Sequence, residues 1–142
     1  MEKIKKLKKI LKREKLDGYL IPKNDEFFGE YIPDYNDRLN YITNFSGSYG
    51  FALILKDKNY LFVDGRYTLQ ANNQSGKSFY IVTIPDKMPI DILKRKKISI
   101  GFDPKLFTKK SLSLFFGKTK CKYIPIKKNL IDEIWRRKIT DS

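Results

Sequence analysis

Histidine is missing from this 142-residue chain, which narrows the chemistry that the sequence can perform. There is no imidazole base, no imidazole metal ligand and no Ser-His-Asp triad. The single cysteine, Cys121, lies between two lysines, and the chain offers no histidine to activate it as a catalytic thiol. One cysteine also excludes a disulfide within the chain. We therefore interpret Cys121 as a structural residue.

Two aspartates stand where metal-dependent nucleases place their ligands. Asp64 and Asp103 each end or follow an expected strand, and nucleases with a ribonuclease-H-like fold use clustered carboxylates to hold two metal ions. The next residue favours a local role in each case, because Gly65 suits a helix cap and Pro104 suits a turn. A small two-metal nuclease stays open as one alternative function, in which asparagine at either position would abolish cleavage.

Phosphate binding is not indicated by the glycine-rich segment Gly47-Ser48-Tyr49-Gly50. A phosphate cradle needs a helix amino terminus directly after it, whereas an apolar strand follows this segment. We interpret the segment as a turn. The chain also has no P-loop, no GxGxxG and no CxxC pattern.

The net charge of +14, from thirty basic and sixteen acidic residues, raises a second alternative, a free-standing nucleic-acid-binding module. Salt-dependent binding to RNA or DNA would support it. The basic residues are nevertheless spread along the chain, lysine predominates over arginine, and no nucleic-acid-binding motif occurs. Solvated surface is the simpler interpretation, so nucleic acid is not expected as a partner.

Residues 37–67 organise the predicted fold. Apolar residues at period two predict a hairpin of two strands, Tyr49–Leu55 and Tyr60–Val63, with one buried face. The residues expected on that face are Phe51, Leu53, Leu55, Leu61 and Val63. A helix is expected over residues 38–45, and another begins near Arg66 with Asp64 as its cap.

The remaining pattern predicts an α/β sandwich. Helices are expected over residues 1–15, 89–97 and 108–116 and from the cap Asn129 to the basic residues Arg136, Arg137 and Lys138. Strands are expected over 19–21, 78–84, 98–102 and 120–126. This order predicts one domain over residues 1–142, with a mixed sheet of five or six strands between helices in a three-layer arrangement. No apolar run approaches a membrane span and no signal peptide is recognisable, so we expect a cytoplasmic protein without membrane contact.

Five short motifs together resemble the amino-terminal domain of Xaa-Pro aminopeptidases, of the aminopeptidase P type in the creatinase/prolidase family (peptidase family M24). They are Glu30-Tyr31-Ile32 before Arg38, Phe45-Ser46-Gly47-Ser48-Tyr49-Gly50, Asp64-Gly65-Arg66-Tyr67 with Gln70-Ala71, Ile100-Gly101-Phe102-Asp103-Pro104, and Asn129 to Trp135. They follow the family's order and span nearly the whole chain. The resemblance implies a ribonuclease-H-like sheet topology, which agrees with the predicted sandwich.

The resemblance also implies a function. In that family, two divalent metal ions (Mn or Zn) are held by two Asp, a His and two Glu in a carboxy-terminal "pita-bread" domain, which releases an N-terminal residue preceding proline. That catalytic domain is absent from residues 1–142, so the chain is expected to be an excised domain or the product of a partial gene. By itself it is expected to have no catalytic residue, no metal ligand and no cofactor.

The implied role is that of a non-catalytic domain that contacts the second and catalytic domains of the parent chain and a second subunit in a homodimer. It would also shape the access of peptide substrate to the metal site of the full-length enzyme. Arg38, Asp64, Arg66 and Tyr67 are the candidate cleft or interface residues. The planar fork of Arg66 can bind a peptide carboxylate or an interdomain acid, and a structural ion pair with Asp64 or with nearby acids is the alternative.

Overall fold

The computed structural model describes residues 2–24 and 32–136. The helices are α1 (Glu2–Arg13), α2 (Arg38–Thr43), α3 (Thr68–Ser75), α4 (Pro89–Leu93), α5 (Lys109–Phe116) and α6 (Leu130–Ile134). The strands are β1 (Gly18–Pro22), β2 (Phe51–Leu55), β3 (Asn59–Asp64), β4 (Tyr80–Ile84), β5 (Ser99–Phe102) and β6 (Lys122–Pro125). Short 3-10 helices cover Asp34–Asn36 and Gly65–Tyr67. Glu30 and Tyr31 of the first family motif lie outside the described residues.

The six strands form one mixed sheet, as predicted, and their order in it is β4-β3-β2-β1-β5-β6. β2 pairs antiparallel with both β1 and β3, whereas β4 pairs parallel with β3, and β5 pairs parallel with β1 and β6. All strands except β2 therefore run in one direction. Their carboxyl ends meet at one edge of the sheet, which is the edge where ligands bind in open α/β folds.

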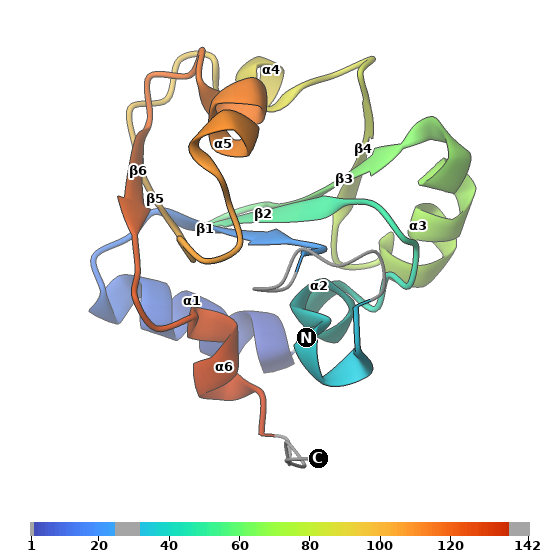
Figure 1. Cartoon of the computed structure of the whole chain (residues 1–142), viewed down its shortest axis with the longest axis horizontal. Coiled ribbons are helices and arrows are strands. Elements are labelled where there is room, and N and C mark those ends of the chain that lie inside the picture. Colours follow the sequence, from blue (N-terminus) through green and yellow to red (C-terminus); the bar gives the residue numbers. More distant parts are fainter. Residues whose placement is uncertain (1, 25–31, 137–142) are drawn as a thin grey trace.

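Helices cover both faces of the sheet and complete three layers (Figure 1). One face packs against α1, α2, α3 and α6, and the other packs against α4 and α5. Each interface has its own apolar core. No helix in the described ranges is long and apolar enough to cross a bilayer.

The prediction of one buried face for the β2–β3 hairpin was wrong. Every residue of β2 is buried, because helices pack on both sides of this central strand. Phe51 lies directly opposite Phe62, so Leu61 and Val63 point to the other face from Phe51. In a strand covered on both sides all positions are apolar, and period two no longer tells which face a residue takes.

The last helix is shorter than predicted. Asn129 caps α6 by accepting the N–H of Ile131, as expected, but the helix ends at Ile134. Trp135 is extended, and its ring stacks on that of Tyr41 with 4.7 Å between ring centroids. Arg136 therefore follows the helix and does not close it, and Arg137 and Lys138 lie outside the described residues. So short a helix is stabilised by its tertiary contacts and not by its length.

Candidate functional site

The motif Asp64-Gly65-Arg66-Tyr67 forms an exposed corner at the carboxyl end of β3. The Asp64 carboxylate caps the following 3-10 helix by accepting the backbone N–H of Arg66 at 2.9 Å, and it also accepts Nε of the Arg66 side chain at 3.2 Å. These hydrogen bonds, the backbone one first, lower the pKa of Asp64, which keeps it ionised at neutral pH. The Arg66 side chain is 73% exposed and lies over the Tyr67 ring. The Arg66 side chain is thus bound at Nε by Asp64 and is otherwise mostly exposed.

Tyr67 joins this corner to the glycine-rich bend that leads into β2. Its hydroxyl lies 2.5 Å from Oγ of Ser48, and its ring packs edge-on against Phe45, which is fully buried. The bend is also tied to α3, because Gln74 accepts the backbone N–H of Ser46 and donates to its Oγ. The bend is a turn before a strand, as predicted. We refer to Ser48, Asp64, Arg66 and Tyr67 as the polar corner.

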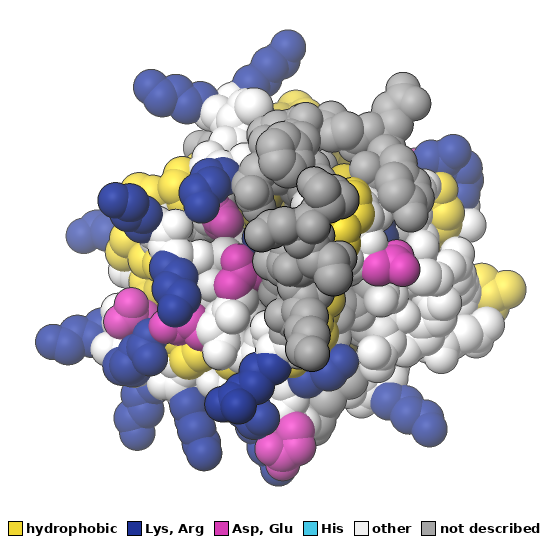
Figure 2. Space-filling model, turned by 60° about the horizontal axis from the view of Figure 1, so that its bottom comes forward, with side chains coloured by type: hydrophobic (Ala, Val, Ile, Leu, Met, Phe, Trp, Pro, Cys, Tyr) yellow, Lys and Arg dark blue, Asp and Glu magenta, His cyan; other side chains and the backbone are white. Residues whose placement is uncertain are grey.

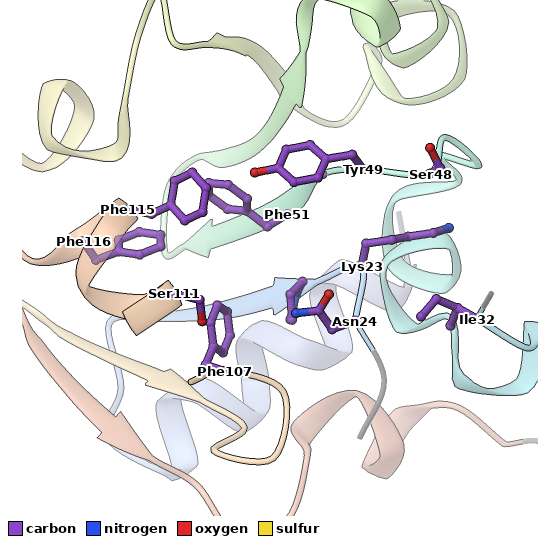
Figure 3. A pocket seen from close by; sticks show the side chains of 12 residues that line it. Lys23, Asn24, Ile32, Ser48, Tyr49, Phe51, Phe107, Ser111, Phe115 and Phe116 are labelled. Atoms are coloured by element: carbon purple, nitrogen blue, oxygen red, sulfur yellow. The ribbon is translucent and has the colours of Figure 1, made fainter. Parts of the chain in front are cut away.

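A pocket of about 130 Å³ opens beside the bend, where β1 ends and β2 begins (Figure 3). Aromatic rings from three distant segments provide most of its wall, namely Tyr49, Phe51, Phe107, Phe115 and Phe116. The lining is completed by Pro22, Lys23, Asn24, Ile32, Ser48, Gly50 and Ser111. We refer to this space as the aromatic pocket. Since Ser48 belongs to both features, the pocket and the polar corner adjoin each other.

Ring contacts hold the wall of the aromatic pocket in place. Phe51 stacks on Phe62 at a centroid distance of 4.8 Å and packs against Phe115 at 5.0 Å and Phe116 at 5.8 Å. Phe107 meets Phe102 edge-on at 5.9 Å. Because these four phenylalanine rings are packed against other rings, most of the pocket wall is formed before any ligand arrives.

Tyr49 extends over the pocket, with its hydroxyl directed toward Phe115 (Figure 3). Its pKa is raised, first by partial burial and then by the negative charge of Asp64, so the phenol stays neutral at physiological pH. The sequence offered little to identify this pocket. Phe115 and Phe116 have the pattern of ordinary helix core, and only the fold brings them to Tyr49 and Phe107.

Arg38, the remaining predicted site residue, lies elsewhere. Only 5% of its side chain is exposed, and it makes a two-pronged ion pair with Asp132, from Nε at 2.9 Å and Nη2 at 3.1 Å. This contact ties α2 to α6. The structure thus brings Asp64, Arg66 and Tyr67 together and places Arg38 in a separate structural contact.

The carboxylates that the nuclease alternative requires are far apart. Asp103 is buried and accepts the N–H of Lys105 and Nδ2 of Asn129, both at 2.9 Å. Two strands lie between β3, which carries Asp64, and β5, which Asp103 follows. β3 and β5 are therefore three strand spacings, or about 14 Å, apart. Paired metal ions lie ~3.5–4 Å apart. Within residues 2–24 and 32–136, no three His, Cys, Asp or Glu side chains could hold a metal ion, so these residues do not fit a dinuclear site.

Basic side chains project around the outline of the face shown in Figure 2, most of them along its left and lower-left side, where Asp and Glu side chains lie among them. The described side chains on that face form no continuous basic stripe of the kind that follows a nucleic-acid backbone. Cys121 is half-buried, and its thiol donates to the carbonyl oxygen of Lys96 at 3.3 Å. That contact is consistent with the structural role predicted for it.

Comparison with known proteins gives one consistent result. Residues 3–134 match the family model described as the Creatinase/Prolidase N-terminal domain. A protein of Coprinopsis cinerea named Probable Xaa-Pro aminopeptidase P is 34% identical over 139 residues, covering 91% of this chain and 22% of that protein. Aminopeptidase P1 of Lotus japonicus is 34% identical over 127 residues, covering 84% of this chain and 19% of its own length. This chain thus spans about a fifth of the curated relatives it matches.

Solved structures confirm the fold. The X-prolyl aminopeptidase of Caenorhabditis elegans, described as a cytosolic enzyme with a di-nuclear active site, matches with a TM-score of 0.84 and 31% identity. The match covers 94% of this chain and 25% of that one. The N-terminal domain of a putative metallopeptidase from Corynebacterium diphtheriae matches with a TM-score of 0.68 at 17% identity, over 88% of this chain and 94% of that domain.

Proposed function

The chain belongs to the family of creatinase/prolidase N-terminal domains, and on that premise we propose that it serves as the non-catalytic amino-terminal domain of a cytoplasmic Xaa-Pro aminopeptidase. The parent reaction is the release of an N-terminal residue that precedes proline. Two divalent metal ions, Mn or Zn, belong in this proposal to a separate catalytic domain. The role of residues 1–142 is to contact the other domains, and a second subunit in a homodimer, and to shape the access of peptides to the metal site.

The polar corner is the observation that carries this proposal. Asp64 binds Nε of Arg66 and so fixes the guanidinium, while most of the Arg66 side chain faces solvent. Such a fork can hold a carboxylate of a peptide or of a neighbouring domain through two hydrogen bonds. It lies at the carboxyl edge of the sheet over the ring of Tyr67, whose hydroxyl contacts Ser48 in the lining of the aromatic pocket.

A binding surface of this kind contributes to catalysis without touching the scissile bond. A contact to a remote part of a peptide that is equally strong in the ground state and the transition state lowers KM and leaves kcat unchanged. Arg66 in this view orients the peptide or the adjoining domain. The cleavage itself belongs to the catalytic domain.

A chimera tests the proposal. Residues 3–134 replace the matching segment of the Caenorhabditis elegans enzyme, and hydrolysis of Xaa-Pro peptides is measured with Arg66→Ala and with Arg66→Lys. We expect Arg66→Ala to raise KM about tenfold, the equivalent of one charge-assisted hydrogen bond, with little change in kcat. Arg66→Lys keeps the charge but loses the planar fork, so its KM should lie between that of the unmutated chimera and that of Arg66→Ala.

The matched control is Arg95→Ala, an exposed arginine in the loop between α4 and β5. It should leave both constants unchanged. Equal kinetics for the Arg66 and Arg95 variants would refute a role of the polar corner in peptide access or domain contact.

A further inference from the structure

Five aromatic rings surround the aromatic pocket, and its volume sets the size of what it can hold. An apolar cavity of about 150 Å³ binds benzene, so a space of about 130 Å³ matches a single phenyl ring or a branched aliphatic group. The ring-on-ring contacts of Phe51 keep this space open and formed in advance. A ligand group therefore enters without a large cost of ordering the wall.

Apart from the Tyr49 hydroxyl, the polar side chains of the lining are already engaged within the protein. Lys23 is paired with Asp37, and the amide of Asn24 donates to the carbonyl oxygen of Leu106. Ser111 forms a reciprocal capping box with Thr108. These groups have no need of a ligand partner, so the pocket selects an apolar group.

The charge around the mouth indicates which molecule presents that group. Ser48 lines the pocket and contacts Tyr67, whose neighbour Arg66 presents its guanidinium to solvent. The net charge of +14 attracts anions. A ligand with an apolar side chain and a carboxylate close by is complementary to both features, and a peptide carries both.

We propose that the aromatic pocket binds one apolar side chain of a peptide, phenylalanine or leucine in size, while Arg66 binds a carboxylate of the same peptide. The choice of a peptide rests on the function proposed above. The pocket and its selectivity for an apolar group rest on the geometry alone. This assigns to the domain a peptide-binding subsite of its own.

The test uses the 142-residue chain itself, labelled with ¹⁵N and titrated by NMR with three probes. N-acetyl-phenylalanine has the ring and the carboxylate, its amide has only the ring, and N-acetyl-glycine has only the carboxylate. We expect N-acetyl-phenylalanine to shift the signals of Tyr49, Phe51, Phe115 and Arg66 and to bind with a dissociation constant on the order of 1 mM, as befits so small a ligand. The amide should bind several-fold more weakly, and N-acetyl-glycine should not shift the pocket residues.

Three variants locate the binding. Phe115→Trp fills the pocket and should weaken binding of N-acetyl-phenylalanine at least about tenfold. Tyr49→Ala removes one aromatic ring from the pocket wall and should also weaken this binding. Leu114→Ala changes the exposed neighbour of Phe115 and should leave binding as in the wild type. Well-dispersed spectra show that each variant is folded.

Unchanged binding in both Phe115→Trp and Tyr49→Ala, or equal shifts with N-acetyl-glycine, would overturn the proposal. So would the absence of any shift at the pocket with millimolar N-acetyl-phenylalanine. None of these outcomes depends on hydrolysis, so a failure here leaves the chimera result standing, and a failure of the chimera leaves this result standing.

Discussion

Two arginines bind the acidic first turn of α6, and burial distinguishes them. Arg38 is 5% exposed where it pairs with Asp132, whereas Arg13 is 56% exposed where it pairs with Glu133. Removing one partner of a buried pair leaves the other charge poorly solvated, and an exposed pair exchanges its partner for water. The two contacts therefore provide a matched comparison.

We expect Arg38→Met to lower the free energy of unfolding by about 2–3 kcal/mol, since it deletes two hydrogen bonds to a partly exposed carboxylate. Urea denaturation followed by the fluorescence of Trp135, which stacks on Tyr41 beside α6, measures the change. Arg13→Met is the control and should have a clearly smaller effect. Equal effects of the two variants would show that the Arg38 contact is not structural.

Tyr19 makes the free energy of unfolding depend on pH in the alkaline range. Its side chain is fully buried, and burial raises its pKa well above the ordinary value, while its hydroxyl accepts the N–H of Leu130. The unfolded chain loses this proton near pH 10 and the folded chain keeps it. The unfolded state then binds fewer protons, so stability present below pH 10 falls as the pH rises further.

If Tyr19 has the ordinary tyrosine pKa in the unfolded chain, it lowers the free energy of unfolding by about 1.4 kcal/mol between pH 8 and pH 11. We expect Tyr19→Phe to remove about that part of the pH dependence, with lysine titration common to both proteins. Denaturation curves of wild type and Tyr19→Phe at the two pH values decide this. Parallel pH profiles would contradict a raised pKa for Tyr19.

At the level of single residues, local chemistry could be predicted and long-range partners could not. The Asp64-Gly65 pair indicated a cap, and Asp64 caps the backbone of Arg66 as expected. The partner of Arg38 is 94 residues away in the chain, and nothing near Arg38 in the sequence points to it. The same limit applies to the hydroxyl contact between Ser48 and Tyr67.

Among the elements, the glycine-rich bend decides where the site residues lie. A Cβ on Gly47 would stand 2.2 Å from the ring of Phe45, which is fully buried and supports Tyr67. A Cβ on Gly65 would meet its nearest atom, Cγ2 of Thr83, at 3.8 Å, which is an ordinary contact. The bend therefore requires glycine at position 47 because of packing.

We expect Gly47→Ala to lower the free energy of unfolding by about 1–3 kcal/mol, which is typical of inserting a methyl group into a packed core. Gly65→Ala is the matched control and should be close to neutral. Urea denaturation measures both, and the NMR signals of Tyr67 and Ser48 report whether the polar corner moves. A neutral Gly47→Ala would mean that Phe45 can shift without loss.

The elements themselves were largely predictable because each carries a local pattern. Thr108 caps α5 and Asn129 caps α6 at the predicted positions. Failures arose where tertiary contacts overrode local pattern, as in β2, whose two buried faces come from helices distant in sequence. The aromatic pocket could not be predicted for the same reason, because Tyr49, Phe107 and Phe115 meet only in the folded sheet.

For the whole molecule, the proposed role separates binding from bond cleavage. The polar corner and the aromatic pocket lie together at the carboxyl edge of the sheet, and the described residues hold no group of side chains suited to a metal ion. In this proposal the domain stands beside a catalytic domain, and the two relatives of which the chain covers 22% and 19% are about five times its length.

The most direct test of the non-catalytic role is a peptidase assay. The purified chain is supplied with Mn²⁺ or Zn²⁺, and its hydrolysis of Xaa-Pro peptides is measured. Calorimetric titration with each metal runs in parallel. We expect no release of the N-terminal residue above the uncatalysed rate and no tight binding of two divalent ions. Metal-dependent turnover by residues 1–142 alone, lost in Asp64→Asn or Asp103→Asn, would contradict the proposed non-catalytic role.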